Sequence, residues 1–151
     1  MPYFNKSIKI LHEQFSREKM IWGHGHFKPH EIYYSPQKDN YYLIDFGHTT
    51  MYPESYELSY IVWSDWLMSA DWNLPYKKWR KGVYGWIKQF KQKEKELKMK
   101  NIETAVRAGL IEMTIRAILI DVAYVSKNKK EVTKRLSLLY KLLNELIKSF
   151  G

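Results

Sequence analysis

Histidines and carboxylates gather in one short part of the chain. Four of the five histidines lie within 25 residues of one another, and Glu31 and Asp45 are two of the three carboxylates in the same stretch. These residues are His24, His26, His30, Glu31, Asp45 and His48. Imidazole nitrogens and carboxylate oxygens bind divalent transition metals, and a histidine near neutral pH can also act as a general base. The pattern H-x-H-x-x-x-H is not a standard zinc-binding spacing, so one shared zinc or nickel ion requires the fold to bring these side chains together.

Two sequence strings contain these residues, and a predicted β-hairpin separates them. The first string, His24-Gly25-His26-Phe27-Lys28-Pro29-His30-Glu31-Ile32, is polar and prone to turns. The second is Tyr42-Leu43-Ile44-Asp45-Phe46-Gly47. Between them, residues 31–35 and 41–45 are rich in Tyr and Ile, which predicts two strands. The intervening residues 36–40 contain Pro, Asp and Asn, which are typical of a turn.

This arrangement resembles the C-terminal lobe of the aminoglycoside phosphotransferase and choline kinase family, which has a protein-kinase-like fold. The family's catalytic loop has the form H-G-D-x-x-x-x-N, follows a helix and leads into a short hairpin that ends in I-D-F-G or I-D-W-E. Residues 52–58, Tyr-Pro-Glu-Ser-Tyr-Glu-Leu, resemble the family's D-P-x-x-D-L segment, which opens the next helix. The resemblance covers residues 5–70.

The resemblance assigns roles to five residues. His26 stands where the family has its catalytic Asp, Glu31 stands where it has a metal-binding Asn, and Asp45 matches its metal-binding Asp. It implies Mg²⁺ held by Asp45 and Glu31, ATP as phosphate donor and a small-molecule hydroxyl as acceptor, because phosphoryl transfer depends on positioning and charge neutralisation. Lys28 is the candidate cofactor-binding residue. The loop histidine, His24, is expected to have a structural role by bonding to backbone.

Three functions are consistent with this sequence. Because two loop positions are altered and one helix alone is expected ahead of the loop, the first is a degenerate, pseudokinase-like lobe. We expect it to be inactive alone, and to self-associate or to pair with a separate chain that supplies an N-terminal lobe. The second is an active magnesium-dependent phosphotransferase completed by another chain, with His26 as base. The third is a basic protein that binds nucleic acid or another polyanion.

The third function comes from the charge distribution. The net charge is +9, and residues 76–151 contain 19 basic and 7 acidic residues, against 6 and 9 in residues 1–75. The stretch 77–100 is the most basic, and Trp79, Tyr84, Trp86 and Phe90 lie within it. Basic residues interleaved with aromatic ones are typical of single-stranded nucleic-acid binding. The same spacing of three and four also fits an amphipathic helix that buries its aromatic side chains.

The predicted fold is α+β and mostly helical, with one domain over residues 1–151. It comprises a helix at 5–20 capped by Asn5, the catalytic-loop equivalent at 22–31, the hairpin at 31–45, a D-F-G-type loop at 45–53 and helical structure over 54–150. Within the last part, helices are expected at the ranges 54–70, 76–99, 102–126 and 130–149. In the first helix, Ile8, Leu11 and Phe15 are expected on one apolar face. The helix at 102–126 is apolar around most of its circumference and should be central and buried.

The rest of the composition excludes cysteine chemistry and indicates the compartment of the protein. There is no cysteine, which excludes disulfides, thiolate zinc sites and cysteine nucleophiles. No apolar run has the length of a signal peptide or a membrane span, so we expect a cytoplasmic protein without membrane contact. A second aromatic concentration is expected to be mostly core, with some members at an interface. Its members are Tyr56, Tyr60, Trp63, Trp66, Leu67 and Trp72.

Overall fold

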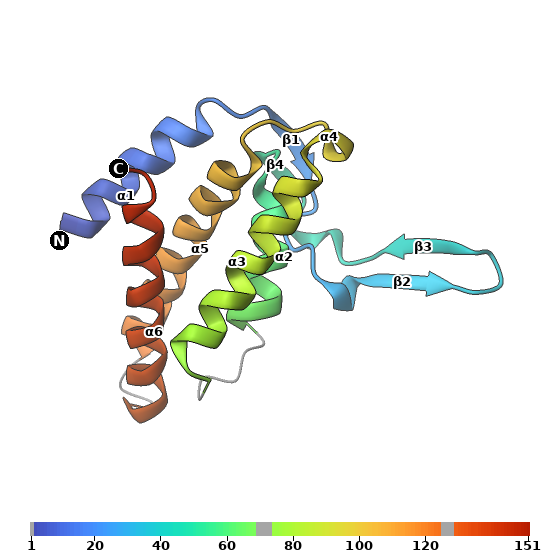
Figure 1. Cartoon of the computed structure of the whole chain (residues 1–151). Coiled ribbons are helices and arrows are strands. Elements are labelled where there is room, and N and C mark those ends of the chain that lie inside the picture. The colour runs from blue at the N-terminus through green and yellow to red at the C-terminus, as the bar shows by residue number, and fades with distance from the viewer. Residues whose placement is uncertain (1, 69–73, 125–128) are drawn as a thin grey trace.

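The computed structural model describes residues 2–68, 74–124 and 129–151 and has an α+β, mostly helical fold (Figure 1). The helices are α1 (Pro2–Phe15), α2 (Tyr56–Trp63), α3 (Tyr76–Gln92), α4 (Glu94–Leu97), α5 (Ile102–Tyr124) and α6 (Lys129–Lys148). The strands are β1 (Met20–Gly23), β2 (Ile32–Ser35), β3 (Asn40–Leu43) and β4 (Thr50–Pro53). Short 3₁₀ turns occupy Pro29–Glu31 and Phe46–His48, and a π-helical turn at Ser64–Met68 continues α2.

The core forms around α5, as predicted. This helix packs against α1, α2, α3 and α6, and its side chains from Ile102 to Ile118 supply much of the buried apolar surface. Val106, Leu110 and Met113 have no exposed surface. The burial ends toward the C-terminal part of the helix, where three apolar side chains are exposed, namely Leu119, Ile120 and Val122.

Two predicted helices have different boundaries. α1 begins at Pro2, which suits the first turn of a helix, so Asn5 lies inside the helix and does not cap it. The expected apolar face of α1 is also partly wrong, because Ile8 is exposed and Ile10 is buried. The predicted helix at 76–99 is divided into α3 and α4, and the left-handed Lys98 ends α4.

The hairpin formed by β2 and β3 is confirmed, and a second strand pair was not predicted. β1 and β4 form an antiparallel ladder in which Trp22 lies opposite Met51. Residues 20–23 had been assigned to the end of a helix and a loop, and residues 50–53 to a loop. Each strand has four residues, and the partner of each lies about thirty residues away, so no local pattern indicates the pairing. Figure 1 shows the β2–β3 hairpin projecting away from the helices, whereas the β1–β4 pair lies against them.

The aromatic side chains in α3 and those in and after α2 mostly lie in the core. In α3, Trp79 and Phe90 are buried and the lysines are exposed, so the amphipathic-helix interpretation is confirmed. In and after α2, the buried members are Tyr56, Tyr60, Trp63 and Leu67. Trp72 lies outside the described residues. Among the helices described, none combines the length and the apolar character needed to cross a membrane.

Candidate functional site

Two antiparallel ladders place the two predicted loops side by side. β1 leads directly into the loop at 24–31 and pairs with β4, so that Gly23 lies opposite Thr50. β2 begins where the same loop ends, and pairs with β3. β3 leads into the turn at 45–48, and β4 follows this turn. The start of the loop therefore lies beside the end of the turn, and the end of the loop lies beside the start of the turn. The candidate residues of the two strings therefore meet at the junction of the two small sheets (Figure 1).

His24 fixes the loop to the end of β3. Its Nε2 lies 2.7 Å from the carbonyl oxygen of Ile44, and because a carbonyl oxygen only accepts, Nε2 is the donor. The Ile44 amide in turn donates to the carbonyl of Glu31 over 3.0 Å. The His24 side chain is buried. The predicted structural role of His24, through a bond to backbone, is confirmed.

Gly25 connects the loop to the helical body. Its φ of +75° lies in the left-handed region, and a Cβ atom there would overlap the hydroxyl of Tyr52 and the carbonyl of His48, so only glycine fits. Its amide donates to Glu57 Oε1 over 2.7 Å. Glu57 lies in the first turn of α2, where the helix dipole stabilises a carboxylate. The start of α2 thereby holds the backbone of the loop in place.

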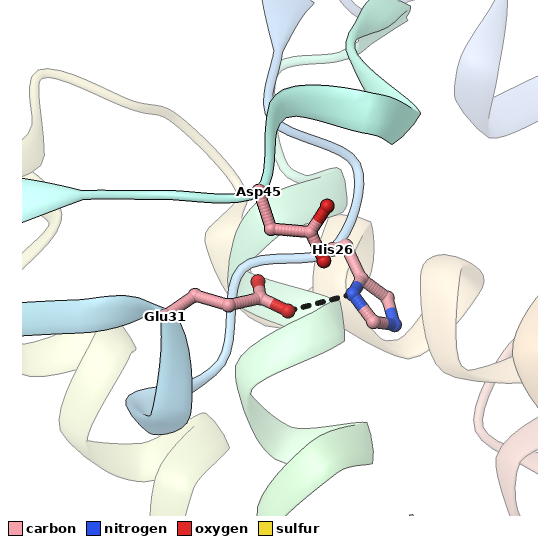
Figure 2. A group of neighbouring side chains, drawn as sticks. All are labelled: His26, Glu31 and Asp45. Atoms are coloured by element: carbon pink, nitrogen blue, oxygen red, sulfur yellow. Dashed lines mark hydrogen bonds and ion pairs between the residues drawn. The ribbon is translucent and has the colours of Figure 1, made fainter.

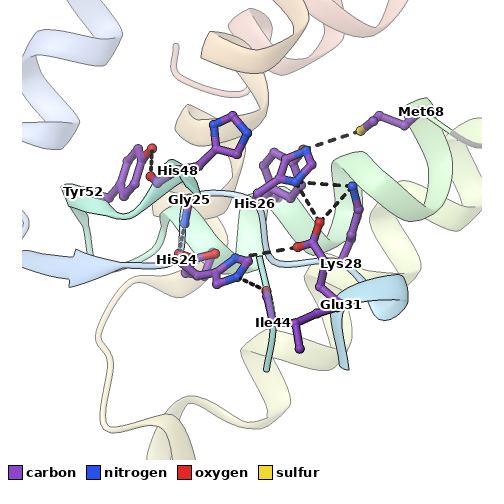
Figure 3. Close-up of polar contacts among 11 residues, drawn as sticks. His24, Gly25, His26, Lys28, Glu31, Ile44, His48, Tyr52 and Met68 are labelled. Atoms are coloured by element: carbon purple, nitrogen blue, oxygen red, sulfur yellow. Dashed lines mark hydrogen bonds and ion pairs between the residues drawn. The ribbon is translucent and has the colours of Figure 1, made fainter. Parts of the chain in front are cut away.

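The carboxylate of Glu31 is buried among three basic side chains, shown in Figure 3. Its Oε1 lies 2.9 Å from Lys28 Nζ and 2.8 Å from His26 Nδ1. Its Oε2 lies 3.7 Å from Nδ1 of His24, and neither of these two atoms has a hydrogen-bond partner among the described residues. The Glu31 residue is only 4% exposed. The buried charge is therefore compensated by groups of the loop itself.

Opposing effects act on the titration of Glu31. Burial disfavours the carboxylate and raises the pKa, whereas the hydrogen bonds from Lys28 and then from His26 favour the carboxylate. The two basic partners prevail, so that the pKa of Glu31 lies below its ordinary value. Glu31 is consequently an anion at neutral pH in spite of its burial.

Asp45 completes a group of three possible metal ligands. One donor atom from each of His26, Glu31 and Asp45 lies within 4.8 Å of the others (Figure 2). Asp45 has a left-handed backbone with φ of 60°, which Asp tolerates better than most residues. Its carboxylate is exposed and makes no hydrogen bond or ion pair with another described residue. Three of the four predicted site residues thus converge, and the fourth, Lys28, forms an ion pair with Glu31 and lies beside His26.

The other histidines are placed differently from one another. The ring of His48 lies beside that of His26, with centroids 4.7 Å apart. His30 is exposed and lines a hollow of about 550 Å³ on the outer side of Lys28, together with Ser64, Asp65 and Met68. Of the grouping expected around one ion, namely His26, His30, Glu31, Asp45 and His48, the structure therefore brings together the donor atoms of His26, Glu31 and Asp45, whereas His48 is a ring neighbour of His26 and His30 lies apart.

Tyr60 belongs to the site and was predicted only as a core residue. Its ring lies 5.1 Å from that of His26, and its hydroxyl donates to the sulfur of Met68. Burial, with a smaller effect of the neighbouring Tyr56, raises the pKa of Tyr60 to about 12. Tyr60 is therefore a neutral phenol at physiological pH. The signal available in the sequence was the pair of tyrosines spaced by four on the helix after the loop.

The arrangement limits what the site can do with magnesium. Mg²⁺ prefers oxygen ligands and keeps several waters, and imidazole is a ligand for transition metals instead. Of the two predicted magnesium ligands, Asp45 is free to bind, whereas Glu31 Oε1 already accepts from Lys28 and His26. The magnesium role that the sequence resemblance implied for Asp45 and Glu31 stays a prediction. The donor set, with one imidazole and two carboxylates, is chemically suited to a transition metal.

Comparisons with known proteins find no relative of this chain. It matches no family model, no curated protein and no solved structure. The function proposed below therefore depends on the motifs of the chain and on the geometry of the site.

Proposed function

We propose that the chain is a degenerate, pseudokinase-like lobe of the aminoglycoside phosphotransferase and choline kinase type, without phosphotransferase activity of its own. The order of helix, loop, hairpin, turn and helices supports this proposal, because it follows the motif order of that family. Glu57 adds support. It lies in the segment that resembles the family's D-P-x-x-D-L, one residue further from Pro53 than in that pattern, and accepts from the backbone amide of Gly25 over 2.7 Å.

The state of Glu31 is the observation that carries the proposal. In an active loop this position offers a neutral amide to a metal ion. Here it carries a buried carboxylate whose Oε1 accepts from both Lys28 and His26. The ammonium of Lys28 supplies the neutralising charge at Oε1, so Mg²⁺ would gain this oxygen only by displacing Lys28 from a mostly buried place.

The contacts of His26, which stands where the family has its catalytic base, support the same conclusion. His26 Nδ1 bonds to Glu31 Oε1, and the ring also packs beside those of His48 and Tyr60. A carboxylate at this position would stay anionic and accept a proton from a substrate hydroxyl, whereas an imidazole cannot carry that negative charge and Nδ1 of His26 is already bonded to Glu31.

Turnover of ATP in the wild-type chain and in His26→Asp tests the proposal. We expect no magnesium-dependent phosphate release above the buffer rate from either protein. Turnover by the wild type, or a gain of turnover in His26→Asp, would overturn the proposal. Either result would favour the alternative of an active phosphotransferase that is completed by another chain.

The hairpin provides the surface through which such a lobe would work with a second chain. Six apolar or aromatic side chains on or beside it are between 37% and 70% exposed, and we call them the hairpin surface. They are Ile32, Tyr33, Tyr34, Tyr41, Tyr42 and Ile44. A two-stranded hairpin has little stability by itself, and an exposed apolar patch is typical of an interface. We propose that a second copy of this chain, or a separate chain that supplies an N-terminal lobe, covers this surface.

Polyanion binding is a second candidate function, favoured by the exposed face of α3. Lysines at 77, 78, 81 and 88 are exposed on this helix, in the half of the chain with the large basic excess. Because Trp79 and Phe90 are buried, they offer no stacking platform, and binding would be electrostatic and sensitive to salt. A gel shift with single-stranded oligonucleotides at low ionic strength tests this function. It is supported if the combined substitution of Lys78, Lys81 and Lys88 by Glu abolishes binding and Asp45→Ala does not. It is overturned if the wild type does not bind.

A further inference from the structure

We propose that His26, Glu31 and Asp45 form a binding site for one divalent transition metal of the zinc class. The three residues come from both ends of the 24–31 loop and from the turn after β3, and Figure 2 shows their donor groups facing a common point. The inference does not depend on the proposed function, because it concerns metal binding alone.

The distances are close to those of a shared ion. Zinc bonds to nitrogen and oxygen are about 2.0–2.2 Å long, so two donors on one ion are about 3–4 Å apart. His26 Nδ1 and Glu31 Oε1 are 2.8 Å apart, and the donor atoms of the three residues lie within 4.8 Å of one another. Shifts of about an ångström would close the three donors on an ion. Asp45 is exposed and has no partner among the described residues, so its side chain can move by that amount.

A second observation points to a missing ligand at the same carboxylate. Glu31 is more than nine-tenths buried, and its Oε2 accepts no hydrogen bond within the described part of the chain. Nδ1 of His24 lies 3.7 Å from this oxygen and also has no hydrogen-bond partner there. Buried carboxylate oxygens are normally hydrogen-bonded or bound to a metal. Oε2 is therefore available to a cation while Oε1 remains near Lys28.

The charges at the site favour a divalent cation. The two carboxylates carry two negative charges, and the Lys28 ammonium compensates one of them. The imidazole of His26 selects transition metals over magnesium and calcium, which prefer oxygen.

Lys28 is the competing cation of this site. Its Nζ is 2.9 Å from Glu31 Oε1 and 3.3 Å from His26 Nδ1, so it occupies a position beside the same two donors. A metal ion must move this ammonium away or share the carboxylate with it. Removal of the charge should therefore strengthen metal binding, which is a result that a purely structural role of the cluster does not predict.

The experiment uses the full chain without a histidine tag, titrated calorimetrically with Zn²⁺ and with Mg²⁺, and spectroscopically with Co²⁺. We expect one Zn²⁺ per chain at micromolar or tighter Kd, no Mg²⁺ binding in that range, and visible Co²⁺ absorption with nitrogen ligation. His26→Ala and Asp45→Asn should each weaken Zn²⁺ binding at least tenfold, and Lys28→Met should tighten it. His30→Ala is the matched control, because His30 lies in the same loop but outside the cluster, and it should leave the Kd unchanged.

The proposal is overturned if the wild type binds no Zn²⁺ in this range, or if His30→Ala weakens binding as much as His26→Ala. It is also overturned if Lys28→Met weakens binding while its circular dichroism shows a folded chain. The ATP experiments test the proposed function independently of the Zn²⁺ experiments. A chain that binds Zn²⁺ and ignores ATP supports both proposals, and a chain that hydrolyses ATP but ignores Zn²⁺ overturns both.

Discussion

Helix α5 and the loop at 24–31 both bury side chains, but the buried groups have opposite chemistry. α5 buries apolar side chains such as Leu110 and Met113, each with no exposed surface. The loop buries a carboxylate and an imidazole, with Glu31 and His24 only 4% and 7% exposed. Burial of apolar surface is favourable by about 25 cal/mol per Å², whereas burial of charge is costly unless the charge is paired.

The two regions differ in what they contribute to the stability of the fold. The packing of α5 against four other helices accounts for the stability of the body. The charges around Glu31 contribute little to that packing, and a loop of the same length without them would avoid the cost of burying them. Clusters of buried titratable groups at the junction of loops are typical of functional sites. The comparison therefore assigns stability to the helices and favours the loop as the candidate place of function.

The largest effect should come from the helical side of the comparison. Leu110→Ala leaves a cavity at a fully buried position, and we expect a loss of about 2–5 kcal/mol in the free energy of unfolding. Ile120→Ala on the same helix is the matched control, because Ile120 is exposed, and it should change stability by less than about 0.5 kcal/mol. Denaturant unfolding measures both. Similar losses in the two variants would contradict the central position of α5.

A smaller effect is expected when the charge compensation of the loop is broken. Lys28→Met leaves Glu31 with His26 as its remaining hydrogen-bond partner at Oε1, and we expect a loss of about 1–3 kcal/mol, because Lys28 is partly exposed. The double variant Lys28→Met/Glu31→Gln removes the charge as well and should recover part of that loss. Lys38→Met, in the exposed hairpin turn, serves as the control and should be neutral. If the two substitutions in the loop simply add, Lys28 and Glu31 are not coupled.

The pH dependence of stability reports on Glu31 directly. Because the pKa of Glu31 is lower in the folded protein than its ordinary value of 4.5, its ionised form stabilises the fold above that pH. This contribution is lost as the pH falls through the folded pKa. Glu31→Gln should therefore show a shallower decrease of stability in acid than the wild type. Parallel curves of unfolding free energy against pH for the two proteins would mean that Glu31 is not held as a buried anion.

The smallest effect on stability should come from the hairpin surface, where association is the informative readout. Tyr33 and Tyr42 lie opposite each other and are exposed, so Tyr33→Ser/Tyr42→Ser should cost less than about 1 kcal/mol. In sedimentation at high concentration, the wild type should self-associate and the double variant should be monomeric. Tyr3→Ser, on the exposed side of α1, is the control and should behave as the wild type. A wild type that stays monomeric would exclude the second copy as the partner and leave the separate chain.

The local parts of this structure could be predicted from the sequence, and the non-local parts could not. The hairpin and the long helices follow from turn residues and from apolar spacing. The β1–β4 ladder depends on contacts between strands of four residues that are distant in sequence, and was missed. On α1, the choice between Ile8 and Ile10 as the buried residue depended on how the helix docks against α5, which its own sequence does not specify.

The sequence predicted which residues form the candidate site, but not the hydrogen bonds and ion pairs that they make. His26, Glu31 and Asp45 were expected to meet, and they do. The ion pair between Lys28 and Glu31 could not be predicted. It depends on the 3₁₀ turn at Pro29–Glu31, which shortens the loop, and on the burial of the Glu31 side chain. Glu57 was matched to a family segment, but its bond to the amide of Gly25 depends on where α2 begins.

Calorimetric titration of ATP into the full chain, with and without magnesium, tests the central claim most directly. The ion pair between Lys28 and Glu31 predicts no magnesium-dependent binding at millimolar nucleotide, in the wild type or in Asp45→Ala. Magnesium-dependent binding in the wild type that disappears in Asp45→Ala would contradict the account, because it would mean that the phosphate site is still functional in this loop.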